Sequence, residues 1–468
     1  MKYIVAIDQS TSATKGFVFD EKAQIVERMS LPHRQFYPKA GWVEQDAEEI
    51  FQNTKRIICK LIHGRSVSAL AFSNQRETVI LWDRETGKPL ANAIGWQDSR
   101  AEEICNRWEE SKEPVHQTTG LLLSPYYSAA KASHALYMHP EWKNDRLCIG
   151  TMDSYIIFRL TEGKKFVTDV TNASRTQLMN LQSLEWDEEI CRLFGIKKDW
   201  LPQILPSDGQ FGYFEGLPIH AVMGDSHAAL FGHGCCNAGD AKATFGTGSS
   251  VMMNVGTKPL LSSHGLSACV GYCFNGSVSY VLEGNVSCSG DTLCWLRDQV
   301  QLLENVEQIE SLAASSADGV YLVPAFVGLG APHFRTNARG ILCGMNRGTT
   351  RAHILRAAME SIAYQDVDVL AAMKEDTGIL PNKLHTDGGP SRNATLMQFL
   401  SDLIPCPVQS AVQSEISAWG AAKMAGISEG LYAPDEIADE SATLYMPQMA
   451  ETLRKSLLTG WRTAVEKA

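Results

Sequence analysis

One local pattern occurs once in each half of the chain: an apolar strand, a short turn rich in hydroxyl side chains, and a second strand. The first copy spans residues 3–19 around the turn Asp8–Lys15, and the second spans residues 243–255 around the turn Gly246–Ser250. Apolar β-type runs on both sides of a polar turn predict β-hairpins. The repetition therefore predicts a duplicated α/β fold, with one polar turn from each half closing over a shared nucleotide.

The first turn carries groups that bind phosphate. Between a carboxylate, Asp8, and an ammonium, Lys15, lie four hydroxyl side chains: Ser10, Thr11, Ser12 and Thr14. Hydroxyl and ammonium groups donate hydrogen bonds to phosphate oxygens, and Asp8 would hold Mg²⁺ directly or through water. Taken alone, the segment is equally consistent with an ordinary hairpin tip.

A second acid, Asp225, follows the apolar run Ala221–Met223 and precedes Ser226 and His227. A carboxylate at the end of a buried strand, facing a phosphate site, suits a catalytic base. The alternative is a helix N-cap, which an Asp before a helical run also suits. The other polar motifs in the chain favour the base.

The length of 468 residues predicts two domains, which we place at residues 1–231 and 232–468. The net charge of -11 argues against a nucleic-acid partner, since no basic run concentrates positive charge. A small neutral substrate fits this composition better.

The twelve cysteines are scattered, and Met1-Lys2-Tyr3 leads directly into a strand without a signal-peptide pattern. We therefore expect reduced thiols and a cytoplasmic location, and no apolar run is long enough for membrane insertion. The cluster of His227, His233, Cys235 and Cys236 lacks the spacing of a closed zinc site and is interpreted as core packing.

Candidate polyol-binding groups follow the predicted strand 67–72. Asp46–Glu49 predicts a capping box for a helix that reaches Ile62, and the strand 67–72 comes next. Arg76 and Glu77 follow this strand, and Trp96 lies beyond the strand 79–82. Charged groups bond hydroxyls and a ring packs on a carbon chain, although a surface ion pair and a core tryptophan are the alternatives.

In the second half, a helix is predicted over 354–363, and a strand over 383–386 leads into Asp387-Gly-Gly389. The glycines allow close approach of a flat ligand, and the helix after them offers amides to phosphate or adenosine, or the segment is a plain strand-to-helix turn. The chain contains no P-loop sequence, and Val251 replaces the third glycine of a dinucleotide fingerprint.

Together these residues resemble the FGGY carbohydrate kinases and, within that family, the glycerol kinases, from Tyr3 to about residue 425. The resemblance implies two ribonuclease-H-like (actin-type ATPase) α/β domains hinged around a cleft. It is carried by Ala6–Ser12, Gly41–Asp46, Asn74–Thr78, Trp96–Asp98, Pro125–Ser128, Thr168–Thr176, Gly224-Asp225, Phe245–Gly248, Gly328–Pro332, Gly340–Met345 and Asp387–Gly389.

The resemblance also implies roles for individual residues. Asp225 matches the general base, and Asp8 and Asp225 match the Mg²⁺-organising acids. The residues matching nucleotide contacts are Thr11, Ser12, Lys15, Gly246, Thr247, Gly389 and Asn393. The residues matching polyol contacts are Arg76, Glu77, Trp96 and Tyr126. ATP and Mg²⁺ are thus implied, together with a small polyol or sugar substrate and a homodimer or homotetramer.

The sequence departs from this pattern at informative positions. Ser10 replaces a glycine, and Lys15 replaces an arginine. Ser226 and Ser250 stand where glycerol kinases place a glutamine and a phenylalanine against the substrate. We expect a roomier, more polar pocket that accepts glycerol or a longer polyol.

Two other functions remain open at this point. One is a ketopentose kinase, although relatives of that type show Met-His-Gly where this chain has Gln75-Arg76-Glu77. The other is a non-catalytic nucleotide-binding sugar sensor of the same fold, for which a catalytic base would have no use.

Overall fold

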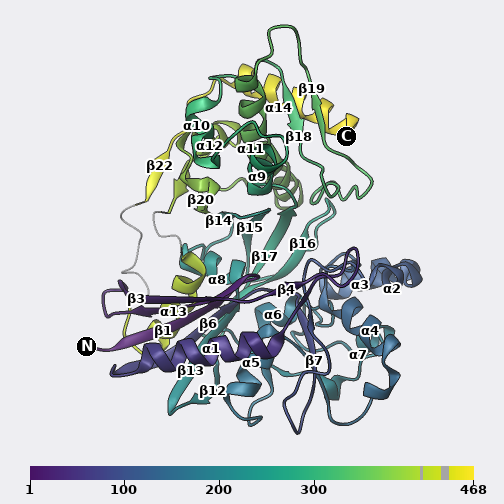
Figure 1. Cartoon of the computed structure of the whole chain (residues 1–468), viewed down its shortest axis with the longest axis vertical. Coiled ribbons are helices and arrows are strands. Elements are labelled where there is room, and N and C mark those ends of the chain that lie inside the picture. The colour runs from purple at the N-terminus through teal and green to yellow at the C-terminus, as the bar shows by residue number, and fades with distance from the viewer. Residues whose placement is uncertain (412–414, 434–441) are drawn as a thin grey trace.

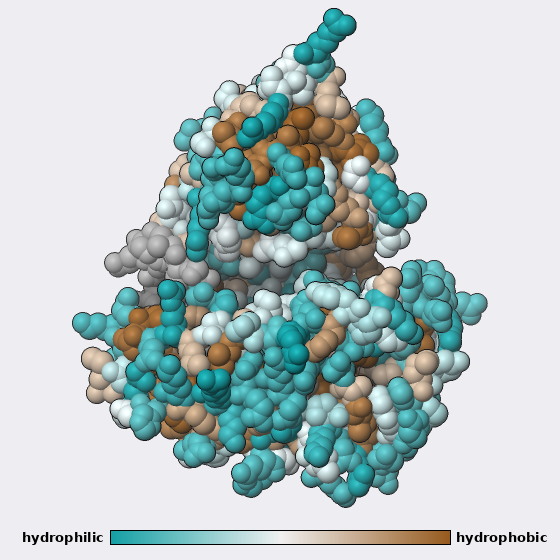
Figure 2. All heavy atoms as spheres, in the orientation of Figure 1, coloured by the Kyte–Doolittle hydropathy of each residue, from teal (hydrophilic) through white to brown (hydrophobic). Residues whose placement is uncertain are grey.

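A computed structural model of the chain shows two α/β lobes, which Figure 1 places one above the other. The structure describes residues 1–411, 415–433 and 442–468. The N-terminus lies in the lower, first lobe and the C-terminus in the upper, second lobe (Figure 1). The space-filling view shows a hollowed waist between the two lobes (Figure 2). This arrangement confirms the predicted fold class.

The first-lobe sheet contains the predicted first hairpin and two strands that run parallel to the first strand of that hairpin. Its order is β12 (Gln210–Phe214), β13 (Leu217–Gly224), β6 (Val67–Asn74), β1 (Tyr3–Gln9), β2 (Ala13–Phe19) and β3 (Ile25–Pro32). The hairpin is β1 and β2, with Asp8 opposite Lys15. β6 runs parallel to both β1 and β13, and its Ser73 pairs with Asp8 on one side and with Met223 on the other. The carboxyl ends of β1, β6 and β13 therefore share one edge.

Side chains of β1 alternate between two cores, as the period of a strand requires. Val5 and Ile7 pack with α1 (Ala47–Ile62) on one face, and Ile4 and Ala6 pack with α13 (Ile416–Ser428) and α8 (Asp225–Gly232) on the other. The sheet is thus a central layer between helices. Its polar edge is left to face the second lobe.

The predicted capping box of α1 forms only in part. The Asp46 carboxylate accepts hydrogen bonds from the amides of Glu48 at 2.9 Å and Glu49 at 3.2 Å. The second hydrogen bond of a capping box would join the Glu49 carboxylate to the Asp46 amide. That part of the prediction is wrong, because the Glu49 carboxylate lies 3.5 Å from Arg34 Nε instead. One side chain satisfies two of the free amides, and α1 begins at Ala47 as a result.

A smaller region completes the first lobe. Its sheet contains β4 (Gln35–Phe36), β5 (Glu44–Gln45), β8 (Ala93–Ile94), β7 (Val79–Asp83) and β9 (Leu147–Thr151). A short parallel pair is formed by β10 (Val167–Asp169) and β11 (Gln203–Leu205). The helices of this region are α2 (Glu102–Arg107), α3 (Lys112–Thr119), α4 (Ser128–Met138), α5 (Met152–Leu160), α6 (Val170–Ser174) and α7 (Glu188–Leu193).

The second-lobe sheet repeats the layout of the first. Its order is β16 (Ser267–Phe274), β17 (Ser277–Val286), β15 (Ser249–Gly256), β14 (Ala241–Phe245), β20 (Leu384–Gly388), β21 (Val408–Ser410) and β22 (Thr443–Tyr445). β14 pairs with β15 as an antiparallel hairpin and with β20 in parallel, as β1 does with β2 and β6. The predicted duplication is therefore present in the sheet topology.

Helices of the second lobe pack around the 27-residue helix α11 (Arg351–Thr377). The others are α9 (Gly290–Asp298), α10 (Ile309–Leu312), α12 (Ala394–Leu403) and α14 (Glu451–Lys467), and a short pair is formed by β18 (Tyr321–Val323) and β19 (Ile341–Cys343). The rings of Tyr364 in α11 and Trp461 in α14 stack with centroids 5.0 Å apart. Within the described ranges, none of these helices has both the length and the apolar character to cross a bilayer. All twelve cysteines are free thiols.

Two segments from the second half of the chain contact the first lobe. In Figure 1, β16 and β17 extend downward to the first lobe, where the hydroxyls of Tyr127 and Ser267 lie 2.8 Å apart. Helix α13 packs on the first-lobe sheet and against α8, although the predicted division at 231/232 assigns it to the second domain. The lobes therefore do not follow chain order throughout.

The contact between α13 and α8 depends on a glycine. A Cβ at Gly420 would lie 1.8 Å from the Ala228 carbonyl oxygen, so Gly420→Ala should force the two helices apart. We expect a loss of about 1–3 kcal/mol, because overpacking against backbone has no side chain to yield. Urea unfolding measures it, with Ser428→Ala at the exposed end of α13 as the control. Equal unfolding midpoints for Gly420→Ala and the wild type would contradict this packing.

Candidate active site

Two carboxylates meet at the shared edge of β1, β6 and β13. Asp8 lies one residue before the end of β1 and accepts a hydrogen bond from the Ser73 hydroxyl at 2.7 Å. Burial raises the pKa of Asp8 from 3.8 to about 6; Lys15 and Ser73 oppose this rise, and the negative charge of Asp225 adds to it. The strand register places Asp8 beside Ser73 and Gly224 beside Asn74, so Asp8 and Asp225 lie at the same edge of the sheet.

Asp225 is the first residue of α8, and Gly224 precedes it as the N-cap. The N-cap interpretation of Asp225 is therefore wrong in position. Its Oδ1 accepts a hydrogen bond from the Ser226 amide at 2.7 Å and lies 3.2 Å from Arg76 Nε. The side chain of Asp225 is 37% exposed, whereas that of Arg76 is 6% exposed. The carboxylate is thus anchored on one oxygen and open to a ligand.

The predicted polyol residues line this crevice beside the first turn. The rings of Trp96 and Tyr126 meet at 73° with centroids 6.0 Å apart. The Trp96 indole donates a hydrogen bond to the Thr11 hydroxyl at 3.0 Å, which joins the aromatic wall to the predicted phosphate turn. Arg76 donates to the Ser226 hydroxyl at 3.3 Å. Five of the predicted residues are therefore brought together from distant parts of the chain.

The first turn places Lys15 over Asp8. The Lys15 ammonium lies 4.0 Å from an Asp8 carboxylate oxygen and 3.1 Å from Glu415. The departure at Ser10 is accommodated, because its hydroxyl donates to the Ala13 carbonyl at 2.9 Å within the same turn. Ser12 is exposed at the tip. The turn thus presents its polar groups without requiring a glycine at position 10.

The second turn faces the start of α9. The amide of Gly290 donates to the Gly246 carbonyl at 3.0 Å, and the amide of Asp291 donates to the Thr247 carbonyl at 3.1 Å. A Cβ at Gly290 would lie 3.4 Å from Pro390, which follows Gly389. The second turn, the start of α9 and the predicted adenosine segment therefore converge.

Gly246 and Gly389 leave open space in front of their backbones. A Cβ at Gly389 would meet no atom within 4 Å, and one at Gly246 would meet only the Gly248 carbonyl oxygen at 3.7 Å. Asn393 caps α12, accepting the amide of Leu396 at 2.9 Å. These positions offer the unobstructed backbone that a phosphate or nucleoside requires.

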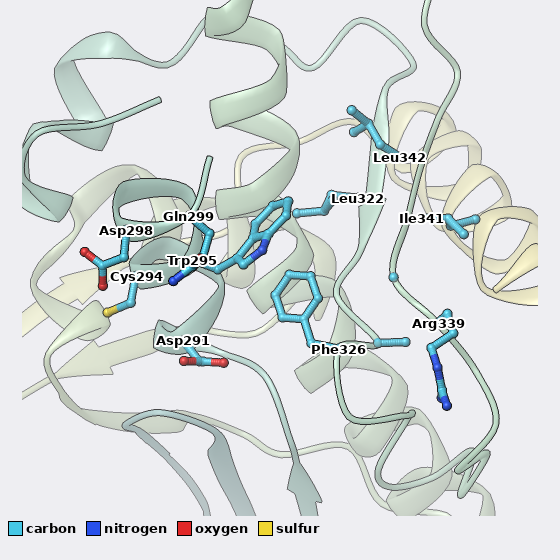
Figure 3. A pocket seen from close by; sticks show the side chains of 12 residues that line it. Asp291, Cys294, Trp295, Asp298, Gln299, Leu322, Phe326, Arg339, Ile341 and Leu342 are labelled. Carbon is cyan, nitrogen blue, oxygen red and sulfur yellow. The ribbon is translucent and has the colours of Figure 1, made fainter. Parts of the chain in front are cut away.

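A cavity of about 610 Å³ lies along α9 in the second lobe. Figure 3 shows Trp295 and Phe326 side by side in it, with Arg339 farther along the wall, and the two aromatic rings have centroids 4.7 Å apart. None of the sequence-predicted site residues lines this cavity. The candidate site therefore depends on the polar cluster at the strand ends and not on cavity size.

Four buried charged residues of the site were missed by the sequence analysis: Lys131, Arg175, Lys242 and Glu283. The Lys131 ammonium donates to the carbonyls of Tyr126 at 2.6 Å and Glu77 at 3.3 Å. Burial lowers the pKa of Lys131 to about 7, against the opposing charges of Glu77 and Asp98. Lys242 and Glu283 carried a signal, since each is a single charge within an apolar strand.

Comparisons with known proteins agree on one family. The N-terminal domain of the FGGY family of carbohydrate kinases matches residues 3–232, and its C-terminal domain matches residues 241–429. The chain is 42% identical to glycerol kinase 1 of Thermotoga maritima, covering 99% of both proteins. It is also 42% identical to the glycerol kinase of Shewanella oneidensis, covering 100% of this chain and 99% of that protein.

Solved structures show the same architecture. Plasmodium falciparum glycerol kinase with ADP superposes with a TM-score of 0.94 at 34% identity, covering 100% of this chain and 98% of that one. A ligand-bound xylulose kinase from Lactobacillus acidophilus superposes with a TM-score of 0.90 at 23% identity, covering 100% and 98%, and so shares the fold.

Burial of Asp8 predicts a pH-dependent cost to stability. The pKa of Asp8 is higher in the folded protein, about 6, than its ordinary value of 3.8, so the folded state loses stability as pH rises through this range. Asp8→Asn should therefore gain stability over the wild type, on the order of 2–3 kcal/mol at about pH 8 and little at about pH 4.

Melting temperatures of both proteins across this pH range measure the effect. Asp83→Asn is the control of opposite sign, because hydrogen bonds from Thr86 hold the pKa of Asp83 below its ordinary value. A difference between Asp8→Asn and the wild type that stays constant with pH would contradict the elevated pKa.

Proposed function

We propose, because this chain belongs to the FGGY family of carbohydrate kinases, that it transfers the γ-phosphoryl group of ATP to a terminal hydroxyl of glycerol or a closely related polyol. The observation that carries the proposal is the pair Asp8 and Asp225 at one edge of the first-lobe sheet, with Arg76 bound to the second acid. Relatives named glycerol kinase match the chain over its full length, and the Plasmodium falciparum enzyme was crystallised with ADP.

We assign Asp225 the role of general base. Its free carboxylate oxygen would accept the proton of the attacking hydroxyl as the phosphorus is approached in line. The position at the N-terminus of α8 and the contact with Arg76 fix the orientation of this carboxylate. Arg76 contacts only Oδ1 of this carboxylate, through its Nε, so the other oxygen can accept a proton.

We assign the nucleotide to the space between the two turns. Thr11, Ser12 and Lys15 of the first turn and Gly246 and Thr247 of the second would bind its phosphates. The open backbones at Gly246 and Gly389 and the capped start of α12 at Asn393 support this placement. Closure of the lobes would exclude water from the transferred group.

The residues present suit Mg²⁺. In the described part of the chain, no three side chains of His, Cys, Asp or Glu lie close enough to hold a metal ion by themselves. Mg²⁺ fits such a site, because it binds through one or two carboxylates together with phosphate oxygens and water. Asp8 and Asp225 would provide the carboxylates, and the ion would neutralise charge on the phosphates.

We assign the polyol to Arg76, Glu77, Trp96 and Tyr126, with Ser226 and Ser250 enlarging the site. The Ser226 oxygen accepts a hydrogen bond from Arg76, which leaves its own O–H to donate to a substrate oxygen. The Ser250 hydroxyl is already committed, since it donates to Glu283 at 2.8 Å. We therefore infer that Ser226 binds the additional hydroxyl of a longer polyol and that Ser250 mainly provides room.

Removal of the proposed base should abolish turnover. Asp225→Asn is expected to lower polyol-dependent formation of ADP by about 10²- to 10⁴-fold, because the amide cannot accept the proton. Titration of ATP binding should show little change in the same variant. Asp199→Asn, at an exposed position, is the control. A wild type that binds ATP but shows no polyol-dependent turnover would identify a sensor instead.

The two serines should set substrate preference. Kinetics on glycerol, erythritol, the pentitols and ketopentoses are expected to favour a polyol longer than glycerol in the wild type. The double variant Ser226→Gln, Ser250→Phe should shift the ratio of kcat/KM values towards glycerol by about 10-fold or more, since two larger side chains refill the pocket and the phenylalanine adds apolar contact. A wild type that strongly prefers glycerol over all the others would refute the enlarged pocket.

A further inference from the structure

Four charged side chains form a buried cluster behind the crevice: Arg76, Glu77, Arg175 and Glu283. Their residues are 6%, 2%, 0% and 1% exposed, respectively. Two positive and two negative charges are thus removed from water together. Such burial is unfavourable unless each charge is paired and hydrogen-bonded.

Glu283 lies at the centre of the cluster. Its carboxylate forms a two-pronged pair with Arg76, with Nη1–Oε2 and Nη2–Oε1 distances of 2.9 Å each. Its Oε2 also lies 2.8 Å from Arg175 Nη1, and its Oε1 accepts the Ser250 hydroxyl at 2.8 Å. Each oxygen therefore accepts one hydrogen bond and lies within ion-pair distance of a second donor, which fixes the orientation of the carboxylate and of the Arg76 guanidinium.

Arg175 connects Glu283 to Glu77. Its Nε donates to the Glu77 carboxylate at 2.6 Å. Glu77 has a φ of +58°, a conformation that is unfavourable for a residue with a side chain. Its carbonyl is held by the Ser128 hydroxyl at 3.0 Å and by the Lys131 ammonium at 3.3 Å. The hydrogen bonds around Glu77 therefore hold its backbone in a strained conformation and fix the orientation of its carboxylate.

The members of the cluster come from both lobes. Arg76, Glu77 and Arg175 belong to the first lobe, and Glu283 lies on β17, the strand that Figure 1 shows reaching down from the second. We propose that Glu283 and Arg175 are positioning residues, which fix Arg76 and Glu77 for polyol binding only while β17 is docked on the first lobe. This inference rests on the proposed function, because Arg76 and Glu77 are assigned there to the polyol.

Glu283 also determines which donors of Arg76 are left for the proposed base, Asp225. Burial alone would raise the pKa of Glu283, but the guanidiniums of Arg175 and Arg76 hold it well below its ordinary range, so Glu283 stays ionised. Arg76 already contacts Asp225 through Nε at 3.2 Å. Because Glu283 pairs with both Nη atoms of Arg76, only Nε is left for Asp225.

Glu283→Gln in the full chain tests the proposal, because the amide keeps the shape and removes the charge. We expect KM for the polyol to rise about 10- to 100-fold and kcat to fall, since small displacements of substrate-binding groups are costly, while KM for ATP changes by less than about 2-fold. A KM for the polyol within about 2-fold of the wild type would overturn the proposal.

Glu360→Gln is the matched control. Glu360 is 4% exposed and pairs with Arg356 at 2.6 Å in α11, outside the cluster. It should lose stability as any buried pair does, with both KM values unchanged. If Glu283→Gln does not fold, Glu283→Asp takes its place, because it retains the charge with a shorter reach. Its KM for the polyol should rise by more than about 2-fold over the wild type, and a smaller change overturns the proposal.

A measurement independent of turnover separates the two proposals. Hydrogen exchange of the arginine Nε–H groups, followed by ¹⁵N NMR and assigned with Arg76→Lys and Arg175→Lys, should be slow for both arginines in the wild type. Glu283→Gln should accelerate exchange at both. Unchanged exchange overturns the positioning role whatever the kinetics, whereas a wild type without polyol turnover but with the expected exchange overturns only the proposed function.

Discussion

Parallel pairing of β1, β6 and β13 is the interaction on which the candidate site depends. Parallel strands present their carboxyl ends at one edge, and the register of these three places Asp8, Ser73 and Met223 side by side there, just before Gly224 and Asp225. Ligands of open α/β sheets bind at such edges. β14 and β20 repeat the arrangement in the second lobe, where the turn Gly246–Ser250 follows β14.

Buried charges of opposite sign from the two lobes also pair with one another. Arg76 and Arg175 would be costly to bury in the first lobe with Glu77 alone, and Glu283 from β17 provides the second negative charge. Removing one partner of such a set is far more damaging than replacing all of it, so the set links docking of the lobes to order in the substrate site. Ser250 belongs to this set through its bond to Glu283.

Local changes at the site are absorbed by neighbouring groups. Ser10 bonds back to its own turn, so the loss of a glycine does not disturb the hairpin. Ser226 and Ser250 have small hydroxyl side chains where glycerol kinases have larger side chains. These hydroxyls form hydrogen bonds with Arg76 and Glu283 of the charged cluster. The hydroxyl of Ser226 keeps a free donor and that of Ser250 does not, which is why the two positions are expected to contribute differently to specificity.

The sequence by itself determined the local elements and much of the site. Hairpins, the cap of α1 at Asp46 and the strand-end acids follow from periodicity, cap chemistry and spacing, all of which act over a few residues. Only the tertiary structure decided that Glu283 pairs with Arg76 across 207 positions and that α13 packs on the first-lobe sheet. Such contacts depend on how the lobes dock, and no local pattern encodes the partner of a buried charge.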